Sequence, residues 1–567
     1  MTKKSKTIIL SLSVIVGMGF ILFIIPPVTK AILQMVESVM GRTLRDPARW
    51  IEIIQHCSFI GLFVIALLNF LLFSKKGNHI FAEIKKSFGE FFSALATKKG
   101  LLFLGITLIA YFFIFWGIIQ AGFYYDDDIW RSYEGSRSWI GYSRYVSEVL
   151  SILIHTNFVL SDIAPLTSIL SILMMSLATL MLSWVADKKQ FRIFSVIAST
   201  FIFISPFFGQ NFAYRFDSPY MVLAVLFPIL PFFCKEDKAA FVFSSVVFVI
   251  LGCMCYQAGC GIYILLTIYF CLLDWLDKKD NKKVFGFAGL SAAAFICALL
   301  IFMIFFMNTL ENSSGNYVST KLSLEGIVEN VKKYSQFTFG YFGGLWTKIF
   351  GIIMVLFTFA SLIIYSKQNK VFTFLFVSLI LLFAFVFSFG PYILFERSLF
   401  APRAFLGFNG FVSFIALLLL QTQNSTSGIR YIGKITVAAL FWGCLVFMNI
   451  YGNALAEQKA YQDFRTNILI SDLNKFVDSD SGCNISFKGS IGHAQGYKES
   501  LKNYPLLKKM ITIVPAEGGI WNDDLFNSLN FSCEDVGLKE NPNYPLLLST
   551  YYHDIYGQDN NFYVVLR

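Results

Sequence analysis

The sequence predicts an all-α polytopic membrane bundle with a small α/β domain at its C-terminal end. Of the 567 residues, 56% are hydrophobic and only 14% are charged, and the mean hydropathy is +0.63. A soluble globular chain carries about 25% charged residues, so this composition indicates a chain that lies largely in lipid. Apolar stretches of roughly 20 residues, the length that crosses the hydrocarbon core, recur as far as residue 453. From residue 454 onward the sequence is polar enough to fold in water.

About thirteen stretches are long and apolar enough to be membrane spans. In chain order they are residues 7–26, 51–73, 100–122, 163–184, 192–209, 217–234, 239–257, 260–276, 284–308, 347–366, 371–389, 404–421 and 435–453. Alternate loops between them are rich in lysine, for example at Lys75, Lys188 and Lys278. Basic loops face the cytoplasm, so the odd number of spans predicts an external C-terminus. Four basic residues between positions 30 and 49 lie on the opposite side and do not fit this pattern.

The same pattern divides the chain into three parts. Residues 1–99 hold two spans, an external amphipathic stretch near 30–48 and a basic cytoplasmic segment, and residues 100–453 hold the other spans. Residues 454–567 alternate helical patterns with short apolar runs, which is typical of a small α/β domain. The helical patterns cover 455–478, 498–510 and 522–530, and the apolar runs cover 484–487, 510–514 and 562–566. Cys483 and Cys533 both lie in this external part, where a disulfide is permitted but not required.

Three consecutive aspartates, Asp126, Asp127 and Asp128, follow the apolar stretch 100–122. They stand where a membrane helix meets water on the predicted external side. Like charges this close repel one another, perturb one another's pKa and need a cation or a proton nearby. A single aspartate at a helix end is usually only solvated. Three of them, flanked by aromatic residues and followed by Arg131, indicate chemistry at the membrane surface.

Arginines gather at the same external ends of the predicted spans. Besides Arg131 they are Arg144, Arg215, Arg397 and Arg403. An arginine at the membrane boundary is costly unless it is paired, so each one is a candidate functional residue. The alternative is that these arginines snorkel to water or pair with acidic residues and only tie loops together. Their planar guanidinium makes bidentate contact with phosphate, which favours them over the external lysines as phosphate ligands.

Missing motifs narrow the chemistry. The sequence has no G-x-x-x-x-G-K-[ST] motif and no G-x-G-x-x-G motif after a predicted strand, so a nucleotide-bound donor is not supported. The lysines lie at cytoplasmic helix ends near the lipid bilayer and form no concentrated basic face, so no nucleic-acid partner is expected. Cysteine and histidine form no metal-binding pattern, and no metal ligands are assigned. The aspartates would suit Mg²⁺ or Mn²⁺ as hard oxygen ligands, and this alternative stays open.

The residues around the aspartates resemble a known family. The pattern Tyr-x-Asp-Asp-x-x-Arg-x-x-x-Gly-x-x-x-Trp-x-x-x-x-Arg runs from Tyr125 through Asp127 and Asp128 to Trp139 and Arg144. It is similar to the first external loop of the phage-type O-antigen glucosyltransferases, the serotype-converting Gtr family of the GT-C superfamily. The resemblance is strongest over about residues 100–220. It implies a GT-C-like transmembrane catalytic core with an external catalytic loop, although many GT-C enzymes place this loop directly after their first helix.

The resemblance also implies a reaction. The donor would be glucose or a related hexose on undecaprenyl phosphate, and the acceptor an O-antigen or other surface glycan at the periplasmic face of a bacterial cytoplasmic membrane. An inverting displacement fits these residues, with Asp127 as the base and Asp126 or Asp128 as its partner. The base removes the proton of the acceptor hydroxyl while arginines hold the departing lipid phosphate. Tyr125 and Trp139 belong to the same expected substrate-binding loop.

Two other functions stay open at this point. A transporter or flippase for a lipid-linked sugar would also have many spans and boundary arginines. Such a protein needs charged residues near the middle of the bilayer and often shows repeated halves. Here the charges gather at the external ends and no repeat is visible, which favours an enzyme. A structural assembly protein that docks through its C-terminal domain would not need the aspartates for any reaction.

The predicted orientation is testable with a reporter enzyme that is active only outside the cytoplasm. Fused after Arg567, the reporter is expected to be active, because the lysine-rich loops alternate consistently and the number of spans is odd. The control is the same reporter fused after Lys189, in a predicted cytoplasmic loop, where it is expected to be inactive. An inactive reporter after Arg567 would contradict an external site.

Overall fold

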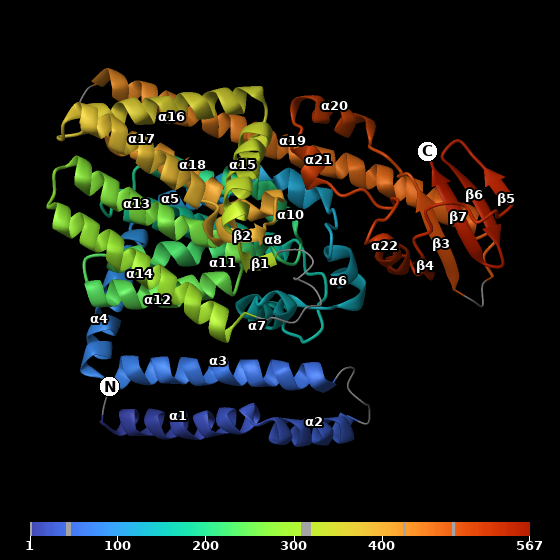
Figure 1. Cartoon of the computed structure of the whole chain (residues 1–567), viewed down its shortest axis with the longest axis horizontal. Coiled ribbons are helices and arrows are strands. Elements are labelled where there is room, and N and C mark those ends of the chain that lie inside the picture. Colours follow the sequence, from blue (N-terminus) through green and yellow to red (C-terminus); the bar gives the residue numbers. More distant parts are fainter. Residues whose placement is uncertain (1–2, 41–46, 308–318, 423–426, 479–481) are drawn as a thin grey trace.

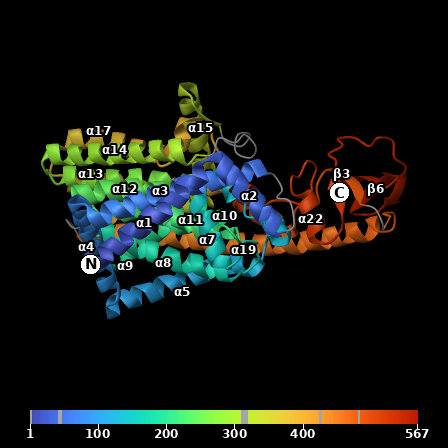
Figure 2. The same cartoon turned by 90° about the horizontal axis from the view of Figure 1, so that it is seen from below.

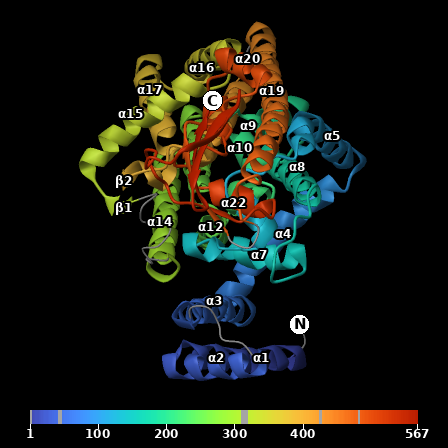
Figure 3. The ribbon, with the colours of Figure 1, turned by 90° about the vertical axis from the view of Figure 1, so that its right-hand side faces the viewer.

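The computed structural model describes residues 3–40, 47–307, 319–422, 427–478 and 482–567. Long helices form a bundle, and a small sheet lies beyond one end of it (Figure 1). The first helices, α1 (Lys3–Ile24), α2 (Pro26–Met40) and α3 (Pro47–Phe73), form a layer of their own beside the bundle. Figure 3 shows that α4 (Lys75–Leu95) connects this layer to the bundle. The chain is a membrane protein with a mostly helical fold, as the composition predicts.

The helices of the bundle follow the predicted spans. They are α5 (Lys98–Ala121), α8 (Leu166–Ala186), α9 (Ile193–Ile204), α11 (Ser218–Leu226) with η2 (Phe227–Cys234), α12 (Lys238–Cys253), α13 (Gly261–Leu276), α14 (Asn281–Phe305), α16 (Leu345–Tyr365), α17 (Lys370–Phe387), α18 (Leu406–Thr422) and α19 (Ser427–Leu473). Every predicted span overlaps one of these helices or α1 or α3.

The number of helices long enough to cross a membrane is smaller than the number of predicted spans. Seven helices in the described ranges are both long and apolar enough, or eight if α1 and α2, which are bent by 93° at their junction, count as one span. The helices α9, α12 and α18 are apolar but shorter, with 12 to 17 residues. The count of about thirteen spans therefore stays a prediction.

Short elements, together with the longer helix α15, gather at the end of the bundle that is nearest the sheet (Figure 1). They are α6 (Asp128–Glu134), η1 (Trp139–Tyr142), α7 (Tyr145–His155), α10 (Phe208–Ala213), η3 (Gln257–Cys260), β1 (Ser319–Leu322), α15 (Leu324–Tyr341), η4 (Gly390–Leu394), β2 (Phe395–Arg397) and η5 (Pro402–Ala404). The two short strands β1 and β2 pair antiparallel. This end of the bundle therefore carries the irregular backbone on which binding residues are commonly found.

Helix α18 lies at the centre of the bundle. Almost every side chain from Leu406 to Leu419 is buried, and α18 packs against α9, α13 and α16. Gly407 and Gly261 bring their backbones against the carbonyl of Ser388, where a Cβ on either residue would collide with that oxygen. In contrast, α14 and α17 expose many apolar side chains, as expected of helices that face lipid tails.

Helix α19 joins the bundle to the sheet. It is a single helix of 47 residues, and it passes the predicted domain boundary at 453–454 without a break. At 1.5 Å per residue it is about 70 Å long, and Figure 2 shows it extending from among the bundle helices to the sheet. It packs along α5, where Gly452 lies against the backbone of Gly117. One continuous rod therefore connects the two parts.

The C-terminal sheet has five strands in the order β4-β3-β7-β6-β5. Its strands are β3 (Cys483–Lys488), β4 (Cys533–Asp535), β5 (Leu546–Ser549), β6 (His553–Gln558) and β7 (Asn561–Leu566). The helices α20 (Gln495–Asn503), α21 (Leu507–Met510) and α22 (Asn522–Ser528) lie between β3 and β4 in the chain. Strand β3 is parallel to β4 and β7, and β6 is antiparallel to β5 and β7. This part of the chain contains helices together with a small sheet, as predicted.

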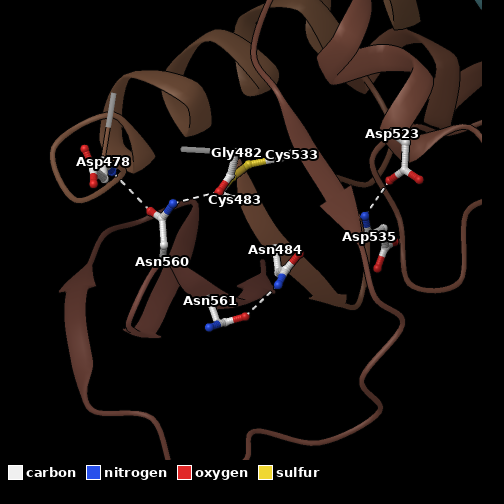
Figure 4. Close-up of a disulfide and its surroundings, with 9 residues drawn as sticks. All are labelled: Asp478, Gly482, Cys483, Asn484, Asp523, Cys533, Asp535, Asn560 and Asn561. Carbon is white, nitrogen blue, oxygen red and sulfur yellow. Dashed lines mark hydrogen bonds between the residues drawn. A yellow bond between two sulfur atoms is a disulfide. The ribbon is translucent and has the colours of Figure 1, made fainter. Parts of the chain in front are cut away.

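A disulfide closes one edge of this sheet. Cys483 and Cys533 face each other in register at the start of β3 and β4, with their Cα atoms 4.5 Å apart (Figure 4). The sequence alone did not decide whether this disulfide forms. On the other side of β3, Asn484 Nδ2 donates to Asn561 Oδ1 of β7 at 2.8 Å (Figure 4). Cross-strand contacts therefore fix β3 on both sides.

The predicted apolar runs are only partly strands. The runs 484–487 and 562–566 lie in β3 and β7, but the run 510–514 is not a strand. Met510 ends α21, and its side chain is buried among side chains of the helix bundle, not of the sheet. The sequence patterns did not predict β4, β5 and β6.

Candidate functional site

Four segments that are distant in sequence meet at the end of the bundle that is nearest the sheet. They are the loop and helix from 122 to 144, the segment 214–217 before α11, the turn η5 and the segment 507–514 of the C-terminal part. Gly122 ends α5 in the left-handed conformation with φ +58°, and Asp126 has φ +46°. These two positions turn the chain after α5, so that the three aspartates point in different directions.

Asp128 is the buried anchor of the loop. Its Oδ2 accepts the backbone N–H of Tyr125 at 3.2 Å and that of Arg215 at 2.9 Å, and its Oδ1 accepts the N–H of Phe216 at 3.4 Å. Burial, together with the negative charge of Asp127, raises the pKa of Asp128 well above its ordinary range. Asp128 therefore ties the loop to the segment before α11 and has no exposed surface with which to meet a substrate.

Asp127 forms an ion pair with Arg131. Arg131 Nη2 lies 2.6 Å and Nε 3.1 Å from Asp127 Oδ2. The guanidinium also lies 3.6 Å from Asp217, donates to the carbonyls of Ser136 and Arg137, and stacks over the ring of Trp139 at 4.1 Å from its centroid. The Arg131 side chain is only 2% exposed, against 26% for Asp127. Arg131 thus holds the loop from within and leaves the carboxylate of Asp127 at the surface.

Asp126 is held on both of its oxygens. Oδ2 accepts the hydroxyl of Tyr214 at 2.9 Å and faces Arg403 Nη1 at 3.3 Å, and Oδ1 accepts the hydroxyl of Thr512 at 3.0 Å. Burial raises the pKa of Asp126, and Arg403, Tyr214 and Thr512 offset part of that rise because each stabilises the ionised form. Asp126 therefore gathers residues from three other segments of the chain.

The other predicted arginines lie at different distances from this cluster. Arg403 stacks over Tyr214 and is 16% exposed. Arg215 Nη2 contacts Asp162 Oδ2 at 2.7 Å, its guanidinium lies over Tyr124, and it lines a cavity of about 160 Å³ between α5, α8, α10 and α19. Arg144 stacks on Tyr256, 4.5 Å from the ring centroid. Arg397 lies on the exposed strand β2 opposite Ser319.

Tyr125 and Trp139, which the resemblance assigned to the substrate-binding loop, are both buried. The hydroxyl of Tyr125 accepts a hydrogen bond from Gln210, and the indole N–H of Trp139 donates to Asp217. Trp139 also packs edge to face on Tyr220. Both residues therefore shape the loop from inside and do not reach its surface.

The carboxylates do not converge on a point that would hold a metal ion. Asp126 faces Arg403 and Thr512, Asp127 faces Arg131, and Asp128 faces backbone N–H groups. Across the described ranges, no three His, Cys, Asp or Glu side chains are close enough together to share a metal. Mg²⁺ and Mn²⁺ need several convergent oxygen ligands, so this donor set does not fit either ion.

An apolar cavity of about 580 Å³ lies in the bundle beside the site. Helices α13, α14 and α17 line it, from Tyr263 to Trp275 along α13, which is roughly 18 Å at 1.5 Å per residue. At the end near the aspartates its lining includes Pro391 and Ile393, the two neighbours of Tyr392. The Tyr392 ring is buried within electrostatic reach of Arg144 and Arg403. The cavity therefore ends next to the arginines.

Sequence reasoning missed several residues of the site. Asp162, Gln210, Thr512 and Glu148 received no role, although Asp162 pairs with Arg215 and Glu148 Oε1 lies 3.1 Å from Arg137. Asp217 lies two residues after the predicted Arg215, but its place beside Arg131 depends on the fold. Charged residues next to apolar stretches are the signal that could have found Asp162 and Glu148.

Comparisons with known proteins give one family and one curated relative. The model of a family described as Glucosyl transferase GtrII matches residues 117–414, more than half of the chain. An uncharacterized 55.3 kDa protein in the gtrB 5' region of Salmonella phage P22 is 24% identical over 445 residues, which is 76% of this chain and 90% of the phage protein. No solved structure matches the chain. The family match contains the aspartates, Arg215, Arg397 and Arg403, and it ends before the C-terminal part.

The anchoring role of Asp128 is testable by stability. In Asp128→Asn an amide NH₂ replaces one of two oxygens that accept backbone N–H groups, so at least one buried donor loses its acceptor, at about 1–3 kcal/mol. The Tm of the detergent-solubilised protein, measured by size-exclusion chromatography after heating, is expected to fall. Glu134→Gln changes an exposed carboxylate on the same helix and is expected to leave the Tm unchanged. Equal Tm values for both variants would contradict the anchoring role.

Proposed function

The chain belongs to the GtrII glucosyl transferase family, and on that premise we propose that it moves glucose from a polyprenyl-phosphate-linked donor to an O-antigen or related surface glycan. The reaction takes place at the periplasmic face of a bacterial cytoplasmic membrane, the face to which the positive-inside rule assigns the aspartates. Such a reaction needs a base for the acceptor hydroxyl, cations for the leaving phosphate and an apolar path for the lipid.

The observation that carries this proposal is the pair of Asp127 and Arg131. Nε and Nη2 of Arg131 contact Oδ2 of Asp127, and Oδ1 of Asp127 accepts no hydrogen bond from any described residue. A buried guanidinium thus fixes the orientation of a carboxylate whose other oxygen is available to a substrate. Asp126 has both oxygens engaged and Asp128 is buried, so Asp127 is the aspartate best suited to act as general base.

The proposed step is a single displacement at the anomeric carbon of the donor. The acceptor hydroxyl oxygen forms a bond to that carbon while its proton passes to Oδ1 of Asp127. The bond from the anomeric carbon to the phosphate oxygen breaks, and its electron pair leaves with the lipid phosphate. Attack from the side opposite the leaving group inverts the anomeric configuration, and no covalent enzyme intermediate is formed.

Arg403 is the residue best placed to receive the leaving phosphate. Its side chain is 16% exposed, against 2% for Arg131, whose guanidinium is committed to protein acceptors. The sequence gave the phosphate role to both arginines, and we keep it for Arg403 and not for Arg131. Arg144 and Arg215 flank the same end of the bundle and add positive charge where negative charge develops on the phosphate.

The apolar cavity supports a lipid-linked donor. No described residue that lines it is charged, and most of its lining is aliphatic or aromatic. An isoprenoid chain in this cavity would lie along α13 and α17, and its phosphate would emerge beside Tyr392, near Arg144 and Arg403. In this arrangement the apolar cavity would hold the lipid, and the arginines at its end would hold the phosphate.

The proposed base is tested by Asp127→Asn in membranes that contain the full-length protein. Transfer of radiolabelled glucose from undecaprenyl-phosphate glucose to O-antigen lipopolysaccharide is expected to fall by about 10²–10⁴, the usual loss for a missing general base. Asparagine still accepts the Arg131 hydrogen bonds but cannot take the proton, so the protein should remain folded. Glu134→Gln is the matched control and should keep the wild-type rate. Wild-type transfer by Asp127→Asn and by the Asp126→Asn and Asp128→Asn variants would refute glucose transfer with an aspartate base.

Arg403→Lys tests the phosphate contact. Lysine keeps the charge but loses the planar fork, so transfer is expected to fall roughly tenfold or more if a contact worth about 1.5–3 kcal/mol is lost. Arg192→Lys is the control, since the Arg192 side chain at the start of α9 is 51% exposed and pairs with Asp187, and its transfer rate should stay near that of the wild type. Equal rates for the two variants, at equal protein abundance, would argue that Arg403 has only a structural role.

A further inference from the structure

A segment of the C-terminal part is inserted into the helix bundle at the site. Leu506, Leu507, Met510 and Ile511 are buried in the same core as the bundle helices. The carbonyl of Met510 accepts the Tyr451 hydroxyl of α19 at 3.3 Å, and that of the preceding residue accepts Gln210 Nε2 of α10, also at 3.3 Å. Apolar burial and backbone hydrogen bonds therefore fix this segment before it reaches residue 512.

Thr512 then contacts the acidic cluster directly. Its hydroxyl donates to Oδ1 of Asp126 at 3.0 Å, while Oδ2 of the same carboxylate is occupied by Tyr214 and Arg403. With a donor on each oxygen, the side-chain rotation of Asp126 is fixed. The position of Arg403 is fixed with it, because that guanidinium pairs with Oδ2.

A second contact holds the other side of the same loop. The hydroxyl of Tyr133 in α6 donates to Asp524 Oδ1 in α22 at 2.7 Å. Asp126 and Tyr133 lie on either side of Asp127 and Arg131 in the sequence. The C-terminal part thus contacts the loop on both sides of Asp127, through Thr512 at Asp126 and through Asp524 at Tyr133.

The left-handed backbone conformation of Asp126 gives a reason for these contacts. Asp126 has φ +46°, in the left-handed region, where residues with a Cβ are strained. A strained conformation persists only when the surrounding structure over-determines it. Tyr214 and Arg403 supply part of that determination from the bundle, and Thr512 supplies the rest from outside the bundle.

We propose that the C-terminal part is a working component of the transfer site, and that Thr512 is a positioning residue that sets Asp126, and through it Arg403, for the donor phosphate. The inference rests on the proposed function. It concerns residues beyond 414, where the family match ends.

Thr512→Val tests the proposal, with Thr512→Ser as the matched control. Valine has nearly the shape of threonine but no hydroxyl, and serine keeps the hydroxyl. Loss of one hydrogen bond is expected to lower the rate of transfer from undecaprenyl-phosphate glucose by about two- to tenfold, and serine is expected to restore most of it. The expected loss is in kcat more than in KM for the acceptor, because Thr512 contacts Asp126 and not the acceptor.

The pH profile separates positioning from a general loss of structure. The groups that face Asp126 are Arg403, Tyr214, Thr512 and the neighbouring Asp127, with Tyr125 and Tyr451 behind them. Thr512 lowers the pKa of Asp126, so in Thr512→Val that pKa rises further. The acidic limb of the pH–rate profile should then move to higher pH in Thr512→Val and stay in place in Thr512→Ser. A Thr512→Val enzyme with the wild-type rate and profile would overturn the proposal.

A measurement without sugar transfer keeps the inference separate from the proposed function. Amide hydrogen exchange over residues 122–135 in the full-length, detergent-solubilised protein should be faster in Thr512→Val than in the wild type or Thr512→Ser. Tyr133→Phe, at an exposed position, should also speed exchange there. If the wild type transfers no glucose from this donor, the proposed function fails, and hydrogen exchange alone tests whether the C-terminal part orders residues 122–135. Unchanged exchange in both Thr512→Val and Tyr133→Phe would overturn the inference that the C-terminal part holds this loop.

Discussion

Burial of the Arg131 guanidinium is the constraint on which the loop after α5 depends. A cation inside a protein is destabilising by several kcal/mol unless its hydrogen-bond donors are matched by acceptors. Here Asp127, Asp217 and two backbone carbonyls supply the acceptors, and the ring of Trp139 covers the flat face. These contacts together fix the course of the backbone from residue 127 to residue 139. It also fastens the loop to the start of α11, because Asp217 is the residue just before that helix.

The remaining charges of the site follow the same logic, since each has a partner from a different segment. Asp128 meets backbone N–H groups, Asp126 meets Arg403, and Asp162 meets Arg215. This separation lets three neighbouring carboxylates coexist without a shared cation. It also divides their tasks. Two of them hold segments together, and the third, Asp127, keeps one oxygen at the surface.

The sequence predicts the helices better than the site. Long apolar windows locate the bundle helices because their length and their lack of charge are local properties, and the cluster of aspartates is visible for the same reason. The sequence cannot show that Asp128 points inward and Asp127 outward, because that depends on φ at Asp126 and on partners near 215. Thr512 was unpredictable since its partner is 386 residues away. Strand β6 has no apolar run because it contains His553, Asp554 and Gln558, and the apolar run in β5 is only three leucines long.

The position of the charges also bears on whether the chain is an enzyme or a carrier. A carrier must pass the charged phosphate of a lipid-linked sugar through the bilayer, which needs charged or polar partners near the middle of the membrane. The described lining of the apolar cavity offers no charged residue over roughly 18 Å along α13. At the end of the cavity near the aspartates, Arg144 and Arg403 supply positive charge. In the proposed reaction, a phosphate held there would stay at one end of the bundle, so its sugar would meet the Asp127 carboxylate without any movement of the head group across the membrane.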